Sequence, residues 1–148
     1  MVNKKSQIKS LQDLNGKRVN IGYVGAGSRI LIERYFNKYL IKPAEIFAFG
    51  AGQSFKGIEA GEIDAWVYFN GHPNPGYLQL LLNSDRFEII PLSETEIENF
   101  KSISKIFKEN SLDLEKFYGI NYQVKTISSE TFLATDIQTS QEIIDFIK

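Results

Sequence analysis

From residue 18 to residue 92, short apolar segments alternate with segments whose apolar residues have a helical spacing. This alternation constrains the fold more than any other feature, because strands that alternate with helices form a mostly parallel sheet covered on both faces. It predicts a three-layer α/β sandwich. The expected strands are Arg18–Gly22, Ile46–Phe49, Ile63–Phe69 and Phe87–Pro91.

Apolar spacing and cap residues predict the helices. Leu31, Tyr35 and Tyr39 recur at four-residue spacing, so one face of a helix over Ser28–Leu40 should contact the core. A short helix is expected after Gly50, closed by a left-handed Gly61, and another at Tyr77–Leu82. A Ser93–Glu96 capping box should begin a helix that reaches about Lys108, with Lys101, Lys105 and Lys108 on its solvated face. Extended segments are expected at Tyr118–Ser128 and Thr131–Thr135, and a final helix at Gln141–Lys148.

The composition argues against several classes of function. The chain has 17 basic and 18 acidic residues and a net charge of −1, so it has no broad basic field for nucleic acid or anionic lipid. It has no cysteine, which excludes disulfides, zinc–thiolate sites and thiol catalysis. A lone His72 argues against a histidine metal site or a Ser-His relay. We therefore predict no enzyme, no cofactor, no metal site and no nucleic-acid partner.

The first residues do not have the pattern of a targeting segment. Met1–Gln7 begins with basic residues, but no apolar region follows them, so this segment is not a signal peptide. No stretch approaches the roughly 18 apolar residues that a membrane span needs. We expect any signal peptide of the parent protein to lie outside this sequence.

The loop Gly25-Ala26-Gly27-Ser28 between a strand and a helix is the most informative motif. Glycines let the backbone turn tightly, and the start of a helix has unpaired N–H groups and the positive end of the helix dipole. Together these features predict an anion receptor. The structural alternative is that Ser28 only caps its own helix.

A dinucleotide site fits this loop poorly. Gly22, Gly25 and Gly27 are spaced G-x-x-G-x-G, not G-x-G-x-x-G, and Glu45 precedes the second strand, whereas a ribose-binding acid would follow it. The chain also has no G-K-[ST] and therefore no P-loop.

Two further loops follow predicted strands and would lie at the same edge of a parallel sheet. Gly50–Ser54 contains the candidates Gln53 and Ser54, and Asn70–Asn74 follows Tyr68. The side chains of Tyr68, Asn70 and His72 could donate hydrogen bonds into a cleft there. The alternative is that this proline-rich loop is only a rigid turn. Asp64 lies at the start of its strand, where a structural acid bonded to backbone amides near Gly61 is favoured over a catalytic one. Trp66, Phe47 and Phe49 are expected in the core.

Taken together, these motifs resemble TAXI-type TRAP transporter solute receptors, relatives of the NMT1/THI5-like binding proteins. The resemblance covers residues 8–148, with the motifs in the same order as in the family. Ala26 stands where the family usually has Ser, which leaves backbone amides as the main donors of the loop. The matching segments are Asp13–Val19 with Ile21-Gly22, Gly25–Ser28, Gly61–Ala65, Gly71–Pro73, Ile90–Leu92, Tyr118–Ile120, Val124–Thr126 and Thr131–Leu133.

The resemblance implies one lobe of a type II periplasmic binding protein, with residues 14–125 as the α/β lobe and residues 126–148 returning toward a first lobe. It implies an extracytoplasmic receptor that delivers a small carboxylate, such as glutamate or 2-oxoglutarate, to the membrane subunits of a TRAP transporter. Surface meant for the other lobe would favour self-association. The predicted solute-binding residues are Gly25, Ala26, Gly27, Ser28, Gln53, Ser54, Tyr68 and Asn70.

Two other functions compete with this one. An enzyme on a similar lobe would use Asp64 or His72 as its acid–base group, but no convergent pair of titratable residues is visible in the sequence. A small-molecule sensor domain would need a linker to an output domain, and none is recognisable.

Overall fold

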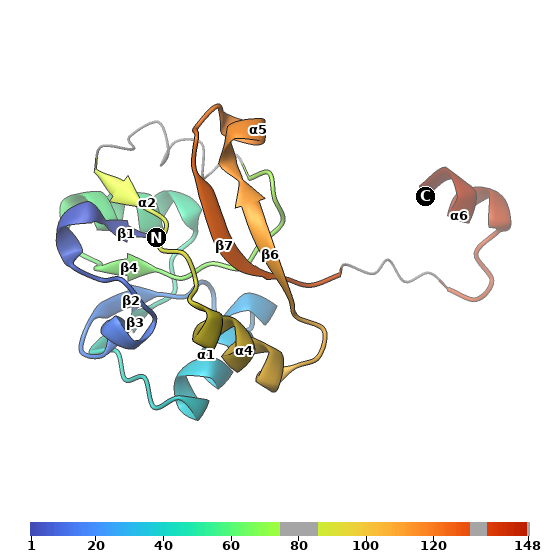
Figure 1. The fold of residues 1–148 in the computed structure, drawn as a ribbon. Helices are drawn as coiled ribbons and strands as arrows, with labels where there is room; N and C mark the ends of the chain where they lie inside the picture. The colour runs from blue at the N-terminus through green and yellow to red at the C-terminus, as the bar shows by residue number, and fades with distance from the viewer. Residues whose placement is uncertain (75–85, 131–135, 148) are drawn as a thin grey trace.

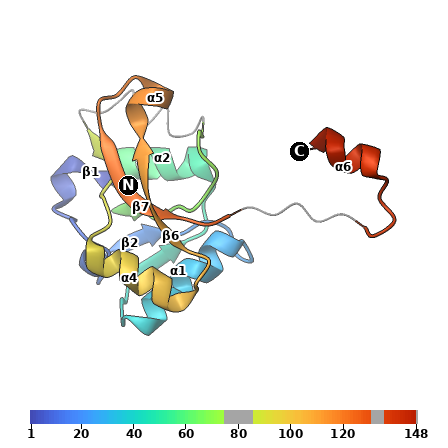
Figure 2. The ribbon, with the colours of Figure 1, turned by 45° about the vertical axis from the view of Figure 1, so that its right-hand side comes forward.

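The computed structural model of the chain describes residues 1–74, 86–130 and 136–147. A mixed sheet lies between helices, with α1 and α4 on one face and α2 on the other (Figures 1 and 2), which confirms the predicted α/β sandwich. The elements are β1 (Val2–Asn3), 3-10 turns at Lys4–Ser6 and Gln12–Leu14, β2 (Arg18–Asn20), α1 (Gly27–Lys38), β3 (Glu45–Phe47), α2 (Ala51–Ala60), β4 (Ala65–Trp66), β5 (Phe87–Glu88), α4 (Glu94–Ile103), β6 (Lys108–Asp113), α5 (Leu114–Tyr118), β7 (Gln123–Ser128) and α6 (Gln141–Ile147).

The main sheet has the strand order β3-β2-β4-β1-β5. β2 pairs in parallel with β3 and β4, whereas β1 runs antiparallel to β4 and β5. The paired parts of β2, β3, β4 and β5 are shorter than the predicted strands. Sequence reasoning missed β1, because Val2–Asn3 is too short to show a periodic pattern.

Apolar side chains fill both faces of the sheet. Leu31 and Tyr35 of α1 are buried against α4 and the sheet, as their spacing predicts. On the other face, Trp66 is 2% exposed and packs with Ile58 of α2, which confirms its predicted place in the core. Phe47 and Phe49 pack against the same cluster. Gly61, with φ of +73°, closes α2 as predicted.

The second half of the chain departs from prediction. The helix expected to reach Lys108 ends at Ile103, so only Lys101 of the three lysines is helical. Lys108–Asp113 forms β6, which pairs with β7 over its whole length. The segment has low strand propensity, so this long-range pairing determines its strand conformation. The extended segment predicted at Tyr118–Ser128 is also wrong in its first part. Tyr118 is the last residue of α5, and the strand begins at Gln123.

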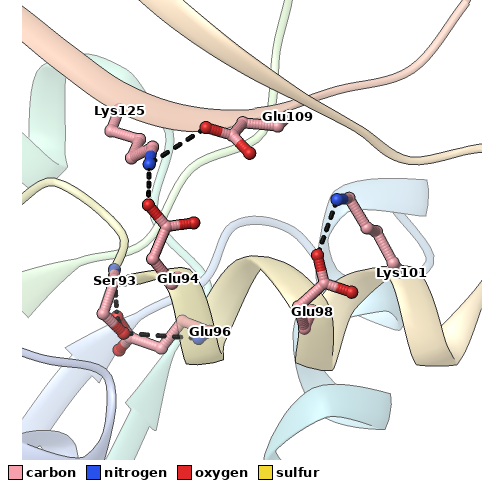
Figure 3. Close-up of polar contacts among 7 residues, drawn as sticks. All are labelled: Ser93, Glu94, Glu96, Glu98, Lys101, Glu109 and Lys125. Carbon is pink, nitrogen blue, oxygen red and sulfur yellow. Dashed lines mark hydrogen bonds and ion pairs between the residues drawn. The ribbon is translucent and has the colours of Figure 1, made fainter.

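The β6–β7 hairpin is attached to α4 by charged residues (Figure 3). The Lys125 ammonium contacts Glu94 of α4 and lies 3.0 Å from a carboxylate oxygen of Glu109 in β6. The predicted capping box begins α4: the Ser93 hydroxyl accepts from the Glu96 amide at 3.3 Å, and the Glu96 carboxylate accepts from the Ser93 amide at 2.8 Å. The Lys125 contacts hold the hairpin across the sheet face that α4 partly covers.

The C-terminal part includes the predicted final helix, α6. In both views α6 lies apart from the sheet and its helices (Figures 1 and 2). The paired hairpin continues to Ser128. The predicted helix at Tyr77–Leu82 and extended segment at Thr131–Thr135 lie outside the described residues. Within the described ranges, no helix has the length and apolar character required to cross a membrane.

Candidate ligand-binding site

The topology brings the three predicted loops to one edge of the sheet. Asn20 is in parallel register with Phe47 of β3 and Trp66 of β4, so the three strands end together. The segments that follow them contain Gly25–Ser28, Gly50–Ser54 and Tyr68–Asn74. We refer to this edge as the rim.

Asn20, which sequence reasoning did not select, holds two parts of the rim together. Its side chain is fully buried. Its amide donates to the Phe49 carbonyl at 3.1 Å and to the Ser54 hydroxyl, while its Oδ1 accepts from the amides of Phe49 at 2.9 Å and Gly22 at 3.2 Å. The available signal was a polar residue inside an apolar strand, since a buried amide must find partners.

Ser54, a predicted solute-binding residue, lies beneath the rim. It is fully buried, and its hydroxyl donates to the Gly50 carbonyl at 2.8 Å while accepting from Asn20. Ser54 therefore fixes the second loop from below. Gln53, one residue earlier in α2, is exposed at the rim.

The two helices that begin at the rim have no side-chain cap. The N-cap residues are Ala26 for α1 and Gly50 for α2, and neither accepts a hydrogen bond through a side chain. The first bonds back to the cap carbonyls come from Ile30 at 3.1 Å and Ser54 at 2.9 Å, so the amides between cap and donor have no intrahelical acceptor. By contrast, the side chains of Ser93 and Asp113 cap α4 and α5.

This arrangement excludes the capping interpretation of Ser28. Ser28 is the second residue of α1, and the helix cap is Ala26, so Ser28 does not cap its helix. Gly25 has φ of +84°, in the left-handed region where glycine is favoured, and this turn directs the chain into α1.

Tyr23 connects the first loop with the second and was also missed. It is 60% exposed, and its ring lies over Gly50 so closely that a Cβ atom at Gly50 would collide with the Tyr23 hydroxyl. Behind the first loop, the Arg29 guanidinium donates to the Gly22 carbonyl at 3.0 Å and to Glu33 at 2.7 Å. The Arg29 charge is thus paired within α1.

A polar groove of about 360 Å³ lies where the third loop meets the hairpin. Tyr68, Asn70 and His72 line one side, and hairpin residues such as Asn110 and Thr126 line the other. The Asn70 amide donates to the Tyr68 hydroxyl. The described lining contains no Asp, Glu, Lys or Arg, so this polar groove is uncharged, and Phe69, Leu112 and Ile127 add apolar surface to its walls.

His72 stays neutral near pH 7, because burial lowers its pKa below the ordinary value of 6.5. Its Nδ1 lies 3.4 Å from the Tyr118 hydroxyl, and its ring meets Phe117 edge-on. Among the described residues, no group of three or more His, Cys, Asp or Glu side chains could hold a metal ion.

Asp64 lies at the opposite edge of the sheet from the rim, because it precedes β4. Its carboxylate accepts from the Arg18 amide at 2.8 Å and from the Arg18 guanidinium at 2.8 Å, and this hydrogen bonding lowers its pKa. The same guanidinium donates to the Gly61 carbonyl at 2.7 Å. Asp64 is therefore structural, as predicted, although its partners belong to Arg18 and not to amides near Gly61.

The predicted site residues thus form two groups. Tyr68 and Asn70 line the polar groove. Gly25, Ala26, Gly27, Ser28 and Gln53 belong to the uncapped helix starts on the neighbouring loops. Thr126 and Ser128 of β7 complete the groove and were missed, because their position depends on the hairpin pairing.

Comparison with known proteins now gives the family. Residues 1–147 match the profile of the NMT1-like family. The chain belongs to the NMT1-like family. This agrees with the broader level of the resemblance in the sequence, whereas the narrower TAXI assignment remains a proposal. The NMT1-like chain is also similar to the periplasmic aliphatic sulphonate binding protein SsuA from Escherichia coli, with 25% identity and a TM-score of 0.44. That match covers 55% of this chain and 27% of SsuA.

Proposed function

We propose that this NMT1-like chain is a solute-binding lobe of an extracytoplasmic receptor. The observation that carries the proposal is the pair of uncapped helix starts, α1 and α2, at the rim that also borders the polar groove. Free amides and the positive ends of two helix dipoles favour an anionic group. Hydrogen-bonding side chains in the groove would orient the rest of the solute. No covalent step is part of this function.

The finer parts of the proposal follow the sequence resemblance. The solute is a small carboxylate, the partners are the membrane subunits of a TRAP transporter, and the protein acts outside the cytoplasm. Gly25, Ala26, Gly27 and Ser28 would bind the carboxylate, with Gln53 beside them. Tyr68 and Asn70 would contact the solute in the groove, and Ser54 would support the second loop.

An NMR titration of backbone amides tests the anion site. Acetate at millimolar concentrations should shift the amide signals of Gly27–Arg29 and Ala51–Gln53, because these donors lack intrahelical acceptors. Acetamide, which has the same shape and no charge, is the matched control and should leave them nearly unchanged. Equal responses to both compounds, or acetate shifts confined to other surfaces, would count against the proposal.

A further inference from the structure

A second hollow, of about 150 Å³, lies inside the lobe between the main sheet and the β6–β7 hairpin. Leu31, Ala65 and Phe100 are among the residues on its sheet and helix side, and Leu112 and Val124 face them from the hairpin. Almost all of its lining side chains are apolar. We call this hollow the apolar cavity.

Glu96, the charged residue in the described lining of the apolar cavity, already has hydrogen-bond donors at both of its carboxylate oxygens. Glu96 Oε1 accepts from the Leu11 amide at 2.7 Å, and Oε2 accepts from the amide and hydroxyl of Ser93 at 2.8 and 2.7 Å. Apolar walls offer water few hydrogen-bond partners, and a hollow of this size can take up a guest as large as a benzene ring.

The apolar cavity adjoins the polar groove. Five residues line both hollows: Tyr68, Phe69, Leu112, Thr126 and Ile127. Of these, Tyr68, Phe69, Leu112 and Thr126 are only half-buried, so the layer between the two hollows is one residue thick and partly open to solvent. A molecule in the groove is therefore within reach of the apolar cavity.

An unfilled apolar cavity costs stability, because its lining atoms lack contact partners on one side. The hairpin that forms one wall is nevertheless held in place by Lys125 and its two carboxylate partners. The groove itself has hydrogen-bonding groups without charge. An uncharged groove with hydrogen-bonding groups beside an apolar cavity fits a molecule with a polar head and an apolar group.

We propose that the solute of this lobe carries an apolar group of up to about six carbon atoms, which enters the apolar cavity while its acidic head stays in the groove and at the rim. This inference rests on the proposed solute-binding function and narrows its substrate class. It favours a monocarboxylate or monosulfonate with a hydrocarbon group over short dicarboxylates such as 2-oxoglutarate.

The test is a titration of the full chain with acetate, butanoate and hexanoate, followed through methyl signals of Leu31 and Ile127 and the amides of the rim. Affinity should rise about tenfold for each two methylene groups, and the cavity methyl signals should respond only to the longer acids. Hexanesulfonate beside hexanoate distinguishes the two acidic heads. 2-Oxoglutarate should bind more weakly than hexanoate.

Filling the apolar cavity should remove the dependence on chain length. Ala65→Leu fills it from β4, and Val124→Leu fills it from β7, so the second variant keeps the test available if the first unfolds; both residues line the apolar cavity and neither lines the groove. Each should bind hexanoate no tighter than acetate while its acetate affinity is unchanged. Ala60→Leu, at the exposed end of α2, is the matched control and should behave as the unaltered chain.

The possible failures can be told apart. If all three acids shift the rim amides with the same affinity and leave the cavity methyl signals unchanged, the inference is wrong and the solute-binding proposal stands. If no acid shifts the rim or the groove, both are wrong. If chain-length dependence persists in the filled variants, the apolar group binds elsewhere and the inference is again overturned.

Discussion

The Asn20 side-chain amide donates a hydrogen bond to the Ser54 hydroxyl, which joins the end of β2 to the first turn of α2 beneath the rim. The same amide and its carbonyl oxygen also bond the backbone of Phe49 at both its C=O and its N–H. One buried side chain therefore determines how the second loop leaves the sheet, and with it the position of the uncapped start of α2.

This network predicts a large effect from a small substitution. Asn20→Ala leaves the half-buried Phe49 amide and carbonyl and the buried Ser54 hydroxyl without this partner, so we expect the free energy of unfolding to fall by about 2 kcal/mol. Ser54→Ala removes a single hydroxyl and should cost about 1 kcal/mol. Urea unfolding measures both. Asn121→Ala, at an exposed asparagine, is the control and should change stability little. A cost for Asn20→Ala no larger than that of the control would mean that this network does not hold the rim.

How much of this site the sequence could predict depends on the range of the interactions involved. The Ser93–Glu96 capping box, the Gly61 cap and the core face of α1 are set by neighbours in the chain, and the structure confirms each. The alternation of strands and helices was likewise enough to bring the three loops to one edge of the sheet.

The groove could not be predicted in the same way. Its second wall is the hairpin, and Lys108–Asp113 has the polar composition of a loop or a helix end, so only its pairing with Gln123–Ser128 makes it a strand. The contact of Tyr23 with Gly50 also depends on the relative position of two loops. Asn20 differs from these, since a polar residue within an apolar strand was a visible signal.

The second prediction separates stability from binding at the first loop. Ala26 has φ of −68° and ψ of 139°, a backbone conformation suited to a capping side chain, so Ala26→Asp should cap α1 and stabilise the chain by about 1 kcal/mol. The same carboxylate occupies the free amides and repels anions, so the response of Gly27–Arg29 to acetate should disappear. Thermal unfolding and the amide titration measure the two effects.

The control for Ala26→Asp places the same charge at another helix start. Thr95→Asp lies in the first turn of α4, which Ser93 already caps, and should leave acetate binding at the rim intact. Ser28→Ala should weaken acetate binding by about 1 kcal/mol, the contribution of one hydroxyl. Unchanged acetate binding in a folded Ala26→Asp variant would move the anion site away from this loop.

The third prediction concerns pH, through the amino group of Met1. This group is buried and donates to the Trp66 carbonyl at 2.8 Å, and burial lowers its pKa from 8.0 to about 5. Between these values the unfolded chain binds more protons than the folded chain, so stability should rise with pH. The difference between the two pKa values corresponds to a gain of about 4 kcal/mol in the free energy of unfolding from pH 5 to pH 8.

One added glycine before Met1 provides the comparison for this pH effect. It converts the amine into an amide, which keeps a donor for the Trp66 carbonyl and cannot titrate. His72 titrates in the same direction in both proteins, because its pKa is also lowered, so the difference between the two urea-unfolding series reports on Met1. Equal slopes with pH would show that the Met1 amino group is solvated in the folded chain.

The last prediction concerns the apolar side chains of the C-terminal segment. Phe146 is 92% exposed and Ile143 is 52% exposed on α6, and Ile137 just before the helix is fully exposed. Neighbouring exposed apolar residues of this kind favour association, so we propose that the isolated chain self-associates through α6. Sedimentation velocity at increasing concentration should show dimers or larger species. Phe146→Ser should shift these species toward monomer. Glu142→Ser, at an exposed polar position on the same helix, is the control and should not shift them, since both replacements alter helix propensity but only the first removes an apolar side chain. A chain that stays monomeric at about millimolar concentration, or equal effects of the two variants, would show that α6 is not the contact surface.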